Sequence, residues 1–504
     1  IGLAGAGASS GMAMAHWEIQ GWMILILGWV FVPFYSRSMV YTMPEFLERR
    51  YNPQSRTILS VISLVSYVLT KVAVTVYAGG LVFQQVFGIK ELWGIDFFWI
   101  AAIGLVVLTA LYTIFGGMKS VLYTSVLQTP ILLLGSLIIL VLGFKELGGW
   151  DEMMRVCGAV TVNDYGDTMT NLIRSNDDAN FPWLGALIGS AIIGFWYWCT
   201  DQFIVQRVLS GKNEKEARRG TIFGAYLKLL PVFLFLIPGM IAFALHQKYI
   251  GAGGEGFLPM LANGTANADA AFPTLVAKLL PAGVKGLVVC GILAALMSSL
   301  ASLFNSSAML FTIDFYKRFR PETPEKKLVG IGQIATVVIV ILGILWIPIM
   351  RSVGDVLYTY LQDVQSVLAP GIAAAFLLGI CWKRTSAQGG MWGLIAGMII
   401  GLTRLGAKVY YSNAGEVADS TFKYLFYDMN WLFFCGWMFL FCIIVVIVVS
   451  LATEAPTAEK IQGLVFGTAT KEQKAATRAS WDHWDIIHTV IILAITGAFY
   501  WYFW

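Results

Sequence analysis

Long apolar segments dominate this chain, and each is long enough to cross a lipid bilayer as a helix. A bilayer core takes about 20 apolar residues per helix. We expect twelve such segments, near residues 17–36, 58–87, 96–115, 121–144, 183–205, 222–246, 283–315, 328–349, 355–380, 389–408, 431–451 and 485–504. Of the 504 residues, 58% are hydrophobic and only 13% are charged, whereas soluble domains carry about 25% charged residues. The pattern predicts an all-α integral membrane protein that forms a single transmembrane domain over residues 1–504.

The basic residues between these segments indicate an orientation. Cytoplasmic loops of membrane proteins carry an excess of Lys and Arg. Most of the 34 Lys and Arg residues fall in six loops, which we therefore expect to be cytoplasmic, at 37–57, 116–120, 206–220, 316–327, 381–388 and 452–484. Twelve crossings then place both ends of the sequence outside. The net charge of +4, without a basic tract, gives no indication of nucleic acid as a partner.

The residue types that carry enzymatic or metal chemistry are scattered. Five of the six cysteines lie in apolar segments, Cys157 is expected in a loop, and no CxxC or Cys/His metal spacing occurs. The four histidines are too dispersed for a metal site. We find no nucleophile–base pair and no phosphate-binding loop, so we expect neither an enzyme nor a bound cofactor.

An aromatic run closes the segment that ends near residue 205. Residues 194–207 read Gly-Phe-Trp-Tyr-Trp-Cys-Thr-Asp-Gln-Phe-Ile-Val-Gln-Arg. One interpretation is an interfacial belt, in which Trp and Tyr sit at the level of the headgroups. The other is a platform for a ring-shaped polyol, because aromatic faces stand beside hydrogen-bonding side chains. Asp201 and Arg207, two turns apart, are interpreted as a structural ion pair or gate element.

Three further polar residues lie in or beside apolar segments, where such groups are expensive and need a partner, a cavity or a substrate. Glu18 follows His16 and Trp17, and its alternative role is a carboxylate at a helix end. Lys228 could instead extend its ammonium to the interface. Gln362 both donates and accepts hydrogen bonds, which suits a substrate hydroxyl; its alternative is a bond between helices.

Residues 291–307 contain hydroxyls at helical spacing. Ala295, Ser298 and Ser299 are spaced i, i+3, i+4, so they share one face of a helix. Two hydroxyls and a main-chain carbonyl could supply oxygens to a hard, weakly held cation. Close packing of small residues between helices uses the same composition and remains the alternative.

Together these segments resemble the sodium:solute symporter family, and specifically its sodium/glucose cotransporter branch. The resemblance runs almost from end to end. The blocks that carry it are Gly-Leu-Ala-Gly at 2–5, Thr-Met-Pro-Glu-Phe-Leu at 42–47, Leu-Tyr-Thr-Ile-Phe-Gly-Gly at 111–117, Trp-Tyr-Trp-Cys-Thr-Asp-Gln at 196–202, Tyr-Leu-Lys-Leu at 226–229, Met-Ser-Ser-Leu at 297–300 and Tyr-Leu-Gln at 360–362.

The resemblance implies a LeuT-type core of two inverted five-helix repeats with peripheral helices, in which substrate binds at the midplane beside a broken helix. It also implies roles for particular residues. The implied substrate-binding residues are Trp17, Glu18, Tyr197, Trp198, Lys228 and Gln362, with Tyr197 as the stacking gate. The implied sodium ligands are the backbone oxygen of Ala295 and the hydroxyls of Ser298 and Ser299.

The sequence also departs from the family pattern. The extra N-terminal helix and most of the first core helix, which would complete the sodium site, are absent from this numbering. The family's Thr-Asp-x-x-Gln is replaced at 124–128 by Thr-Ser-Val-Leu-Gln. Ala301 stands where members with a second sodium site carry a hydroxyl. We therefore expect one sodium ion per substrate molecule.

The resulting hypothesis is a symporter in the plasma membrane that couples the inward sodium gradient to uptake of a glucose- or galactose-like hexose by alternating access. Glu18 in the expected pocket disfavours a carboxylated substrate such as a sialic acid or an amino acid. A symporter for another polyol such as myo-inositol, and a sugar sensor or channel that does not transport, remain alternatives. The preferred sugar, its affinity and the oligomeric state stay open.

Overall fold

The structure is a computed structural model that describes residues 2–261, 264–353, 357–413 and 418–504. Side chains are described at these positions except 112, 114–122, 124, 125, 127, 349–353 and 359. Short segments of the π-helical type interrupt several of the long helices, so that one crossing is built from consecutive pieces.

The first half of the chain forms helices and one short hairpin, β1 (Glu91–Leu92) with β2 (Ile95–Asp96). Its helical elements are α1 (Gly2–Ser10), η1 (Gly11–Met14), α2 (Ala15–Glu18), α3 (Gly21–Ile26), η2 (Leu27–Phe31), α4 (Val32–Ser38), α5 (Met43–Arg50), α6 (Pro53–Ser66), η3 (Tyr67–Val72), α7 (Ala73–Phe87), α8 (Phe97–Leu147), α9 (Trp150–Gly158), α10 (Trp183–Gly194), η4 (Phe195–Thr200), α11 (Gln202–Leu209), α12 (Glu214–Pro231), η5 (Val232–Leu236) and α13 (Ile237–Gly251).

The second half is helical throughout its described elements. They are η6 (Ala268–Ala270), α14 (Ala271–Leu279), α15 (Ala282–Met309), η7 (Leu310–Tyr316), α16 (Lys317–Phe319), α17 (Glu325–Val353), α18 (Leu357–Cys381), α19 (Ala387–Asn413), α20 (Thr421–Lys423), η8 (Tyr424–Asp428), α21 (Trp431–Ala452), α22 (Ala458–Ile461), α23 (Lys471–Ala479) and α24 (His483–Tyr502).

Eleven helical stretches among the described residues are long and apolar enough to cross a membrane. The difference from the twelve expected lies in α8, which contains both the segment expected at 96–115 and the one expected at 121–144. Its apolar portions, Phe97–Leu111 and Gln128–Leu147, are continuous in helical backbone, so the loop expected at 116–120 is wrong. The physical reason is that Gly116 and Gly117 weaken a helix without breaking it.

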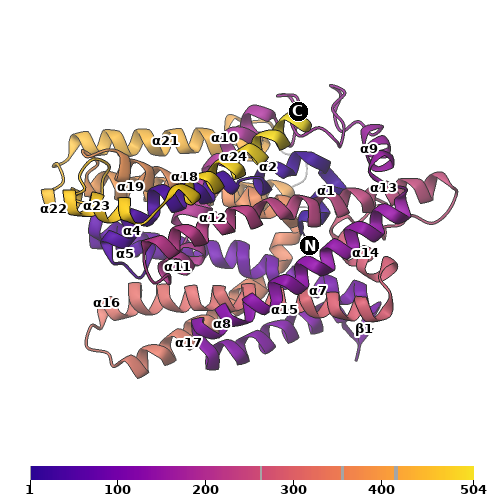
Figure 1. Cartoon of the computed structure of the whole chain (residues 1–504), viewed down its shortest axis with the longest axis horizontal. Helices are drawn as coiled ribbons and strands as arrows, with labels where there is room; N and C mark the ends of the chain where they lie inside the picture. The colour runs from indigo at the N-terminus through magenta and orange to yellow at the C-terminus, as the bar shows by residue number, and fades with distance from the viewer. Residues whose placement is uncertain (1, 262–263, 354–356, 414–417) are drawn as a thin grey trace.

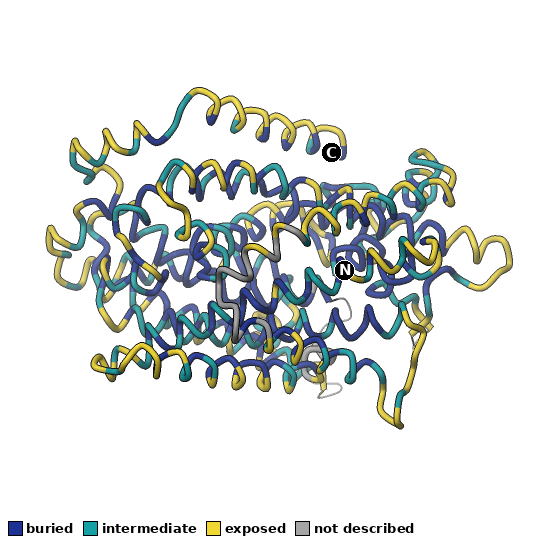
Figure 2. Tube along the Cα trace, turned by 60° about the horizontal axis from the view of Figure 1, so that its bottom comes forward, coloured by how far each residue is buried: buried dark blue, intermediate teal, exposed yellow. Residues whose placement is uncertain are grey.

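Two groups of helices pack closely, one around α18 and one around α8. In one group α18 lies against α10, α19 and α21, and in the other α8 lies against α7 and α15 (Figure 1). In the most apolar 18-residue stretch of each helix, 83% of the α18 residues are buried within the protein, but only 22% of the α24 residues. Figure 2 shows the same contrast, with buried residues through the middle of the molecule and exposed residues along the helix that ends at C. α18 is therefore a central helix, and α24 lies at the periphery.

Two π-helical segments carry the polar and aromatic groups of the interior. η4 contains the aromatic run identified in the sequence, and η3 contains Tyr67 and Lys71. Both segments contact α18. A π-helical turn widens a helix by one residue and is found frequently at functional sites.

Candidate functional site

All six residues expected to bind substrate line one cavity in the middle of the bundle. The cavity has a volume of about 210 Å³. It is lined by Trp17, Glu18, Gln20, Ile193, Gly194, Tyr197, Trp198, Lys228, Tyr358, Leu361, Gln362 and Gln365. Pockets for drug-sized molecules have volumes of about 300–1,000 Å³, so this cavity suits a smaller molecule. The sequence interpretation of these six residues as neighbours agrees with this geometry.

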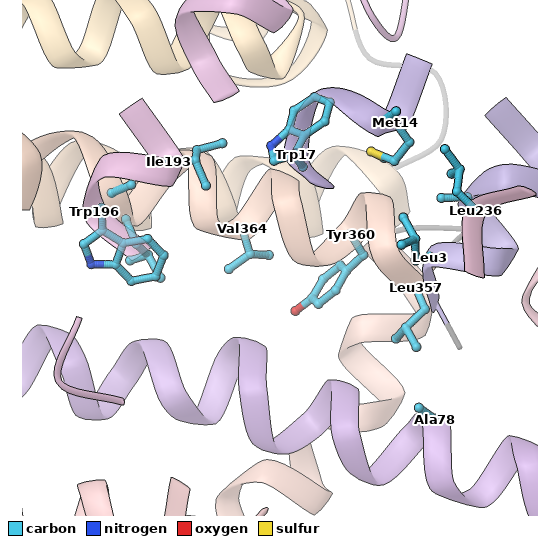
Figure 3. Close-up of a cluster of buried hydrophobic side chains, with 14 of the residues drawn as sticks. Leu3, Met14, Trp17, Ala78, Ile193, Trp196, Leu236, Leu357, Tyr360 and Val364 are labelled. Atoms are coloured by element: carbon cyan, nitrogen blue, oxygen red, sulfur yellow. The ribbon is translucent and has the colours of Figure 1, made fainter. Parts of the chain in front are cut away.

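Five elements that are distant in the sequence supply the lining. The residues come from α2 and the turn after it, α10, η4, α12 and α18. Figure 3 shows how apolar residues of the same elements fix this region: Trp17 and Ile193 lie on one side of α18, which carries Val364 and Tyr360. Trp17 also stacks on Trp431 of α21, with ring centroids 5.4 Å apart. The polar groups of the cavity therefore rest on a packed apolar frame.

Glu18 is the electrostatic centre of the cavity. Lys228 donates to one of its carboxylate oxygens, with Nζ and Oε2 2.6 Å apart, and the hydroxyl of Tyr358 donates to the other. Gln362 lies one helical turn after Tyr358 on α18 and lines the same cavity. Side chains from three different helices thus form one connected polar chain. Glu18 and Lys228 are thus paired with each other, with side chains only 7% and 14% exposed.

Two buried polar atoms of the lining have no hydrogen-bond partner within the part of the chain that the structure describes. They are the acceptor Oε1 of Gln362 and the donor Nε1 of Trp17. Buried polar groups are nearly always hydrogen-bonded, and an unsatisfied one costs about 1–3 kcal/mol. A bound molecule with hydroxyl groups could satisfy both atoms, because a hydroxyl donates and accepts.

The aromatic run supplies one wall. The ring centroids of Tyr197 and Trp198 are 5.1 Å apart in an edge-on arrangement, and the ammonium of Lys228 lies 5.3 Å from the Trp198 ring centroid. Trp196 is buried but is not among the residues of the lining. Tyr197 and Trp198 therefore face the cavity, which supports the platform interpretation for two of the three aromatics.

Sequence reasoning missed three polar residues of the lining. Tyr358 precedes Gln362 by four residues, so helical spacing places both on one face and could have identified it. Gln365 adds a second buried amide on α18. Gln20 donates to the Ser190 carbonyl at 2.7 Å, and a Cβ on Gly194 would meet its Oε1 at 2.3 Å. No feature of the sequence indicates that contact, because it depends on how closely α10 approaches the turn after α2.

The expected sodium ligands lie on α15, apart from this lining. Ser298 is buried, Ser299 is exposed and Ala295 is intermediate between the two. Ala301 is fully buried and contributes no side-chain oxygen. The side chains of Thr124, Ser125 and Leu127 lie outside the described residues. The oxygens of Ala295, Ser298 and Ser299 stand on one helix, and their assignment to sodium remains a proposal.

The partner expected for Asp201 is wrong. Its carboxylate pairs with Lys71 and accepts from the Tyr67 hydroxyl at 2.8 Å, whereas Arg207 donates to the Ser302 hydroxyl at 2.5 Å. Asp201 stands where η4 ends and α11 begins, so its side chain points toward η3 rather than along its own helix. A lysine inside an apolar segment was the available signal for this pair. Cys157 is likewise buried in helix α9 rather than in a loop.

Comparison with solved structures defines the class of protein. A sodium-coupled sialic acid symporter in a substrate-bound outward-open state is similar over 90% of this chain and 86% of its own, with a TM-score of 0.66 and 20% sequence identity. At that identity the likeness shows the fold alone. The fold is that of the LeuT-type symporters, an all-α membrane architecture of inverted repeats, as expected.

Comparison of sequences then shows the family. The model of the sodium:solute symporter family matches residues 1–397. Human sodium/myo-inositol cotransporter 2 is 36% identical over 93% of this chain and 70% of its own length. Sodium/glucose cotransporter 1 of Ovis aries is 37% identical over 90% of this chain and 70% of its own. Zebrafish (Danio rerio) sodium/glucose cotransporter 4 is 35% identical over 95% of this chain and 74% of its own length. The chain belongs to the sodium:solute symporter family.

Membership confirms several expectations. The protein is a sodium-coupled solute symporter and a multi-pass membrane transporter rather than an enzyme. Sodium is its coupling ion. The relatives are named for a hexose and for a polyol, so the family alone leaves the choice between these two kinds of solute open.

Proposed function

We propose that this protein uses the sodium gradient to take up a neutral sugar of the glucose or galactose type through the plasma membrane. The observation that carries the proposal is the unpartnered Oε1 of Gln362, which lies beside the Glu18–Lys228–Tyr358 chain in a cavity walled by aromatic rings. Sugar hydroxyls can donate to Gln362 and can replace hydrogen bonds within the Glu18–Lys228–Tyr358 group. A sugar ring can stack on Tyr197 at the same time. We place the α11 side of the cavity toward the cytoplasm, following the positive charge of the adjoining loops.

The charges of the cavity argue against a carboxylated solute. Lys228, the cation of the lining, is already paired with Glu18 at 2.6 Å. A substrate carboxylate would compete with Glu18 for Lys228 and would lie close to a like charge. Such juxtaposition of like charges costs several kcal/mol. A neutral polyol avoids that cost.

Coupling follows if sodium and sugar favour the same conformation. Sodium would bind on the face of α15 that holds Ser298 and Ser299, and sugar would bind in the cavity. Two ligands that stabilise one state raise each other's affinity by the same factor. The membrane potential adds about 2.3 kcal/mol of driving force for each positive charge that moves inward through 100 mV. We propose one sodium ion per sugar, because Ala301 offers no hydroxyl for a second site.

The test is sodium-dependent uptake of labelled glucose and galactose into proteoliposomes that contain the purified protein. We expect Gln362→Ala to reduce uptake at least tenfold, because a sugar hydroxyl loses a buried acceptor worth about 1–3 kcal/mol. Ser299→Ala should raise the sodium concentration for half-maximal uptake. Matched controls are Gln84→Ala, an amide that bonds to Asp96 beside the hairpin, and Ser412→Ala, an exposed hydroxyl at the end of α19.

Wild-type uptake in both Gln362→Ala and Ser299→Ala would contradict the site assignment. The ratio of labelled sodium to labelled sugar tests the stoichiometry, and a clear ratio of two sodium ions per sugar would contradict it.

Myo-inositol is the second candidate, favoured by the 36% identity to the human inositol cotransporter and by a cavity that recognises hydroxyls rather than charge. Uptake of labelled inositol in competition with glucose separates the two. A sensor or channel would give a sugar-dependent current without accumulation against a gradient.

A further inference from the structure

A second buried ion pair lies next to the aromatic run, outside the lining of the cavity. Lys71 of η3 pairs with Asp201, and the side chains are only 9% and 2% exposed. The hydroxyl of Tyr67 donates to the same carboxylate and accepts from the main-chain N–H of Phe203 at 3.1 Å. η3 is thereby tied to the junction between η4 and α11. The mechanism of binding described above makes no use of this cluster.

The ammonium of Lys71 is enclosed by aromatic rings. It lies within 6.0 Å of four ring centroids, at 4.4 Å from Phe203, 4.7 Å from Tyr67, 5.0 Å from Tyr197 and 6.0 Å from Trp196. A cation over an aromatic face is attracted to it, and more strongly when water is excluded. Tyr197 therefore contributes to two structures at once: the lining of the cavity and the enclosure of Lys71.

The cluster stands at a break in the helix. Asp201 has extended backbone angles, with φ −77° and ψ 126°, between the end of η4 and the start of α11. Its carboxylate also accepts from the N–H of Phe203 at 3.0 Å, which caps α11. Non-helical backbone at membrane depth is tolerated only where protein or a water-filled cavity surrounds it. Asp201 thus lies at the junction of η4 and α11 and ties it to η3.

Cavities lie near both ends of this break. The smaller one is lined by Tyr197, and a larger one of about 620 Å³ is lined by Tyr35, Gln206 and residues of the loop after α11. The hydroxyl of Tyr35 donates to the carbonyl of Cys199 at 2.6 Å. η4 is therefore the segment that stands between the two spaces.

We propose that Lys71 is a positioning residue for Tyr197: its pairing with Asp201 holds η4 in place and keeps the aromatic wall closed on the α11 side of the cavity. The proposal rests on the proposed function, since it is release of sugar on this side that the wall would control. Opening then requires Lys71 and Asp201 to separate. Removing the pair shifts the equilibrium toward the open state, because only the closed state contains its contacts.

The chain provides its own reporter of this equilibrium. Cys199 of η4 is fully buried beside the proposed wall, and Cys435 of α21 is fully buried elsewhere. The rate at which a small thiol reagent modifies each cysteine can be followed by peptide mass spectrometry on the full chain in membrane vesicles. Sugar is omitted, so that failure of the positioning role and failure of sugar transport are distinguishable.

The decisive variant is Lys71→Met/Asp201→Asn, which removes both charges and leaves no unpaired ion. Asparagine caps a helix as well as aspartate does. We expect Cys199 to be modified about tenfold faster, as a tenfold gain in the open population requires, with Cys435 unchanged. The matched control is Lys278→Met, which removes another lysine from an aromatic ring, 4.8 Å from the Phe257 centroid, and should leave Cys199 at the wild-type rate.

A wild-type rate at Cys199 in the doubly neutral variant overturns the proposal, because the pair would then serve only to neutralise buried charge. If both cysteines react faster, the variant is unfolding. The exchanged pair Lys71→Asp/Asp201→Lys, which restores two opposite charges at these positions, then tests the proposal. Slow modification of Cys199 in that chain supports the proposal, and fast modification overturns it.

Discussion

Two lysine–carboxylate pairs flank the aromatic run, and they differ in what surrounds them. Glu18 and Lys228 line a cavity of about 210 Å³, with side chains 7% and 14% exposed. Lys71 and Asp201 are 9% and 2% exposed, and aromatic rings occupy the space around them. The two pairs use the same chemistry, so charge alone does not tell a binding group from a positioning group.

The difference lies in unused hydrogen-bonding capacity. Beside Glu18, the Oε1 of Gln362 has no partner within the described part of the chain, and there is room for a molecule that could supply one. Around Asp201, the hydroxyl of Tyr67, the amine of Lys71 and the N–H of Phe203 already bond to the carboxylate. A buried pair with spare capacity and space can recognise a ligand, whereas a saturated pair can only hold structure together.

Removing the carboxylate of the first pair should have the largest effect. Glu18→Gln leaves Lys228 without its counter-charge in the cavity where we propose that sugar binds. We expect sodium-driven sugar uptake to fall by at least 100-fold in proteoliposomes matched for protein content. The control is Glu152→Gln, which removes an exposed pair with Arg155 on α9. Uptake within a few-fold of wild type would show that Glu18 is not at the binding site.

The second pair should matter more for stability than the first. Lys71→Met leaves Asp201 unpaired among aromatic rings, and we expect a loss of about 3–5 kcal/mol in unfolding free energy. Lys228→Met should cost less than half as much, because Glu18 borders a cavity that water can enter, whereas aromatic rings fill the space beside Asp201. Denaturation of the detergent-solubilised variants measures both. Equal losses would remove the distinction between the two pairs.

A smaller effect separates the members of the first cluster. Tyr358→Phe removes the hydroxyl that donates to Glu18 and frees a carboxylate oxygen for a substrate hydroxyl. A hydrogen bond to a charged group is worth about 1.5–3 kcal/mol. A substrate hydroxyl that takes the place of the Tyr358 hydroxyl offsets part of this loss, so we expect the KM to change by severalfold. Because a hexose and an inositol place their hydroxyls differently, the ratio of their KM values should change as well. Tyr226→Phe, whose hydroxyl faces His488 away from the cavity, is the control.

The sequence predicted the membrane class, the approximate positions of the crossings and the six residues that meet in the cavity. The class and the crossings follow from hydrophobic length, and Glu18, Lys228 and Gln362 follow from polar groups placed where a bilayer penalises them. The roles of Trp17, Tyr197 and Trp198 were implied by the family resemblance. The continuity of α8 was missed because short glycine-containing segments are permissive: both helix and turn can form there. The partner of Asp201 was missed because pairing between η3 and η4 is a tertiary contact, which spacing along one helix cannot reveal.

The same limit applies to the details of the cavity. Helical spacing could have placed Tyr358 beside Gln362, but the bond from Tyr358 to Glu18 joins α18 to α2 across the bundle. Similarly, the position of the Gln20 side chain depends on the absence of a side chain at Gly194. Residue types indicated which groups needed partners, and only the packing of the helices determined which partners they received.

A third buried carboxylate extends the comparison, because its partner is a main-chain amide rather than a lysine. Both oxygens of Asp269 accept from the N–H of Leu357, at 3.1 and 3.2 Å, and burial raises the pKa of Asp269 from 3.8 to about 7. Between these values the folded state holds a proton that the unfolded state has released, so the contribution of Asp269 to stability is greatest below pH 4 and falls as the pH rises toward 7. We expect the thermal midpoint to decline from pH 5 to pH 7 and Asp269→Asn to flatten this decline. Asp419→Asn is the control, since a hydrogen bond from Lys423 lowers the pKa of that exposed carboxyl out of this range. An unchanged slope in Asp269→Asn would show that a buried carboxylate without a lysine can remain ionised here.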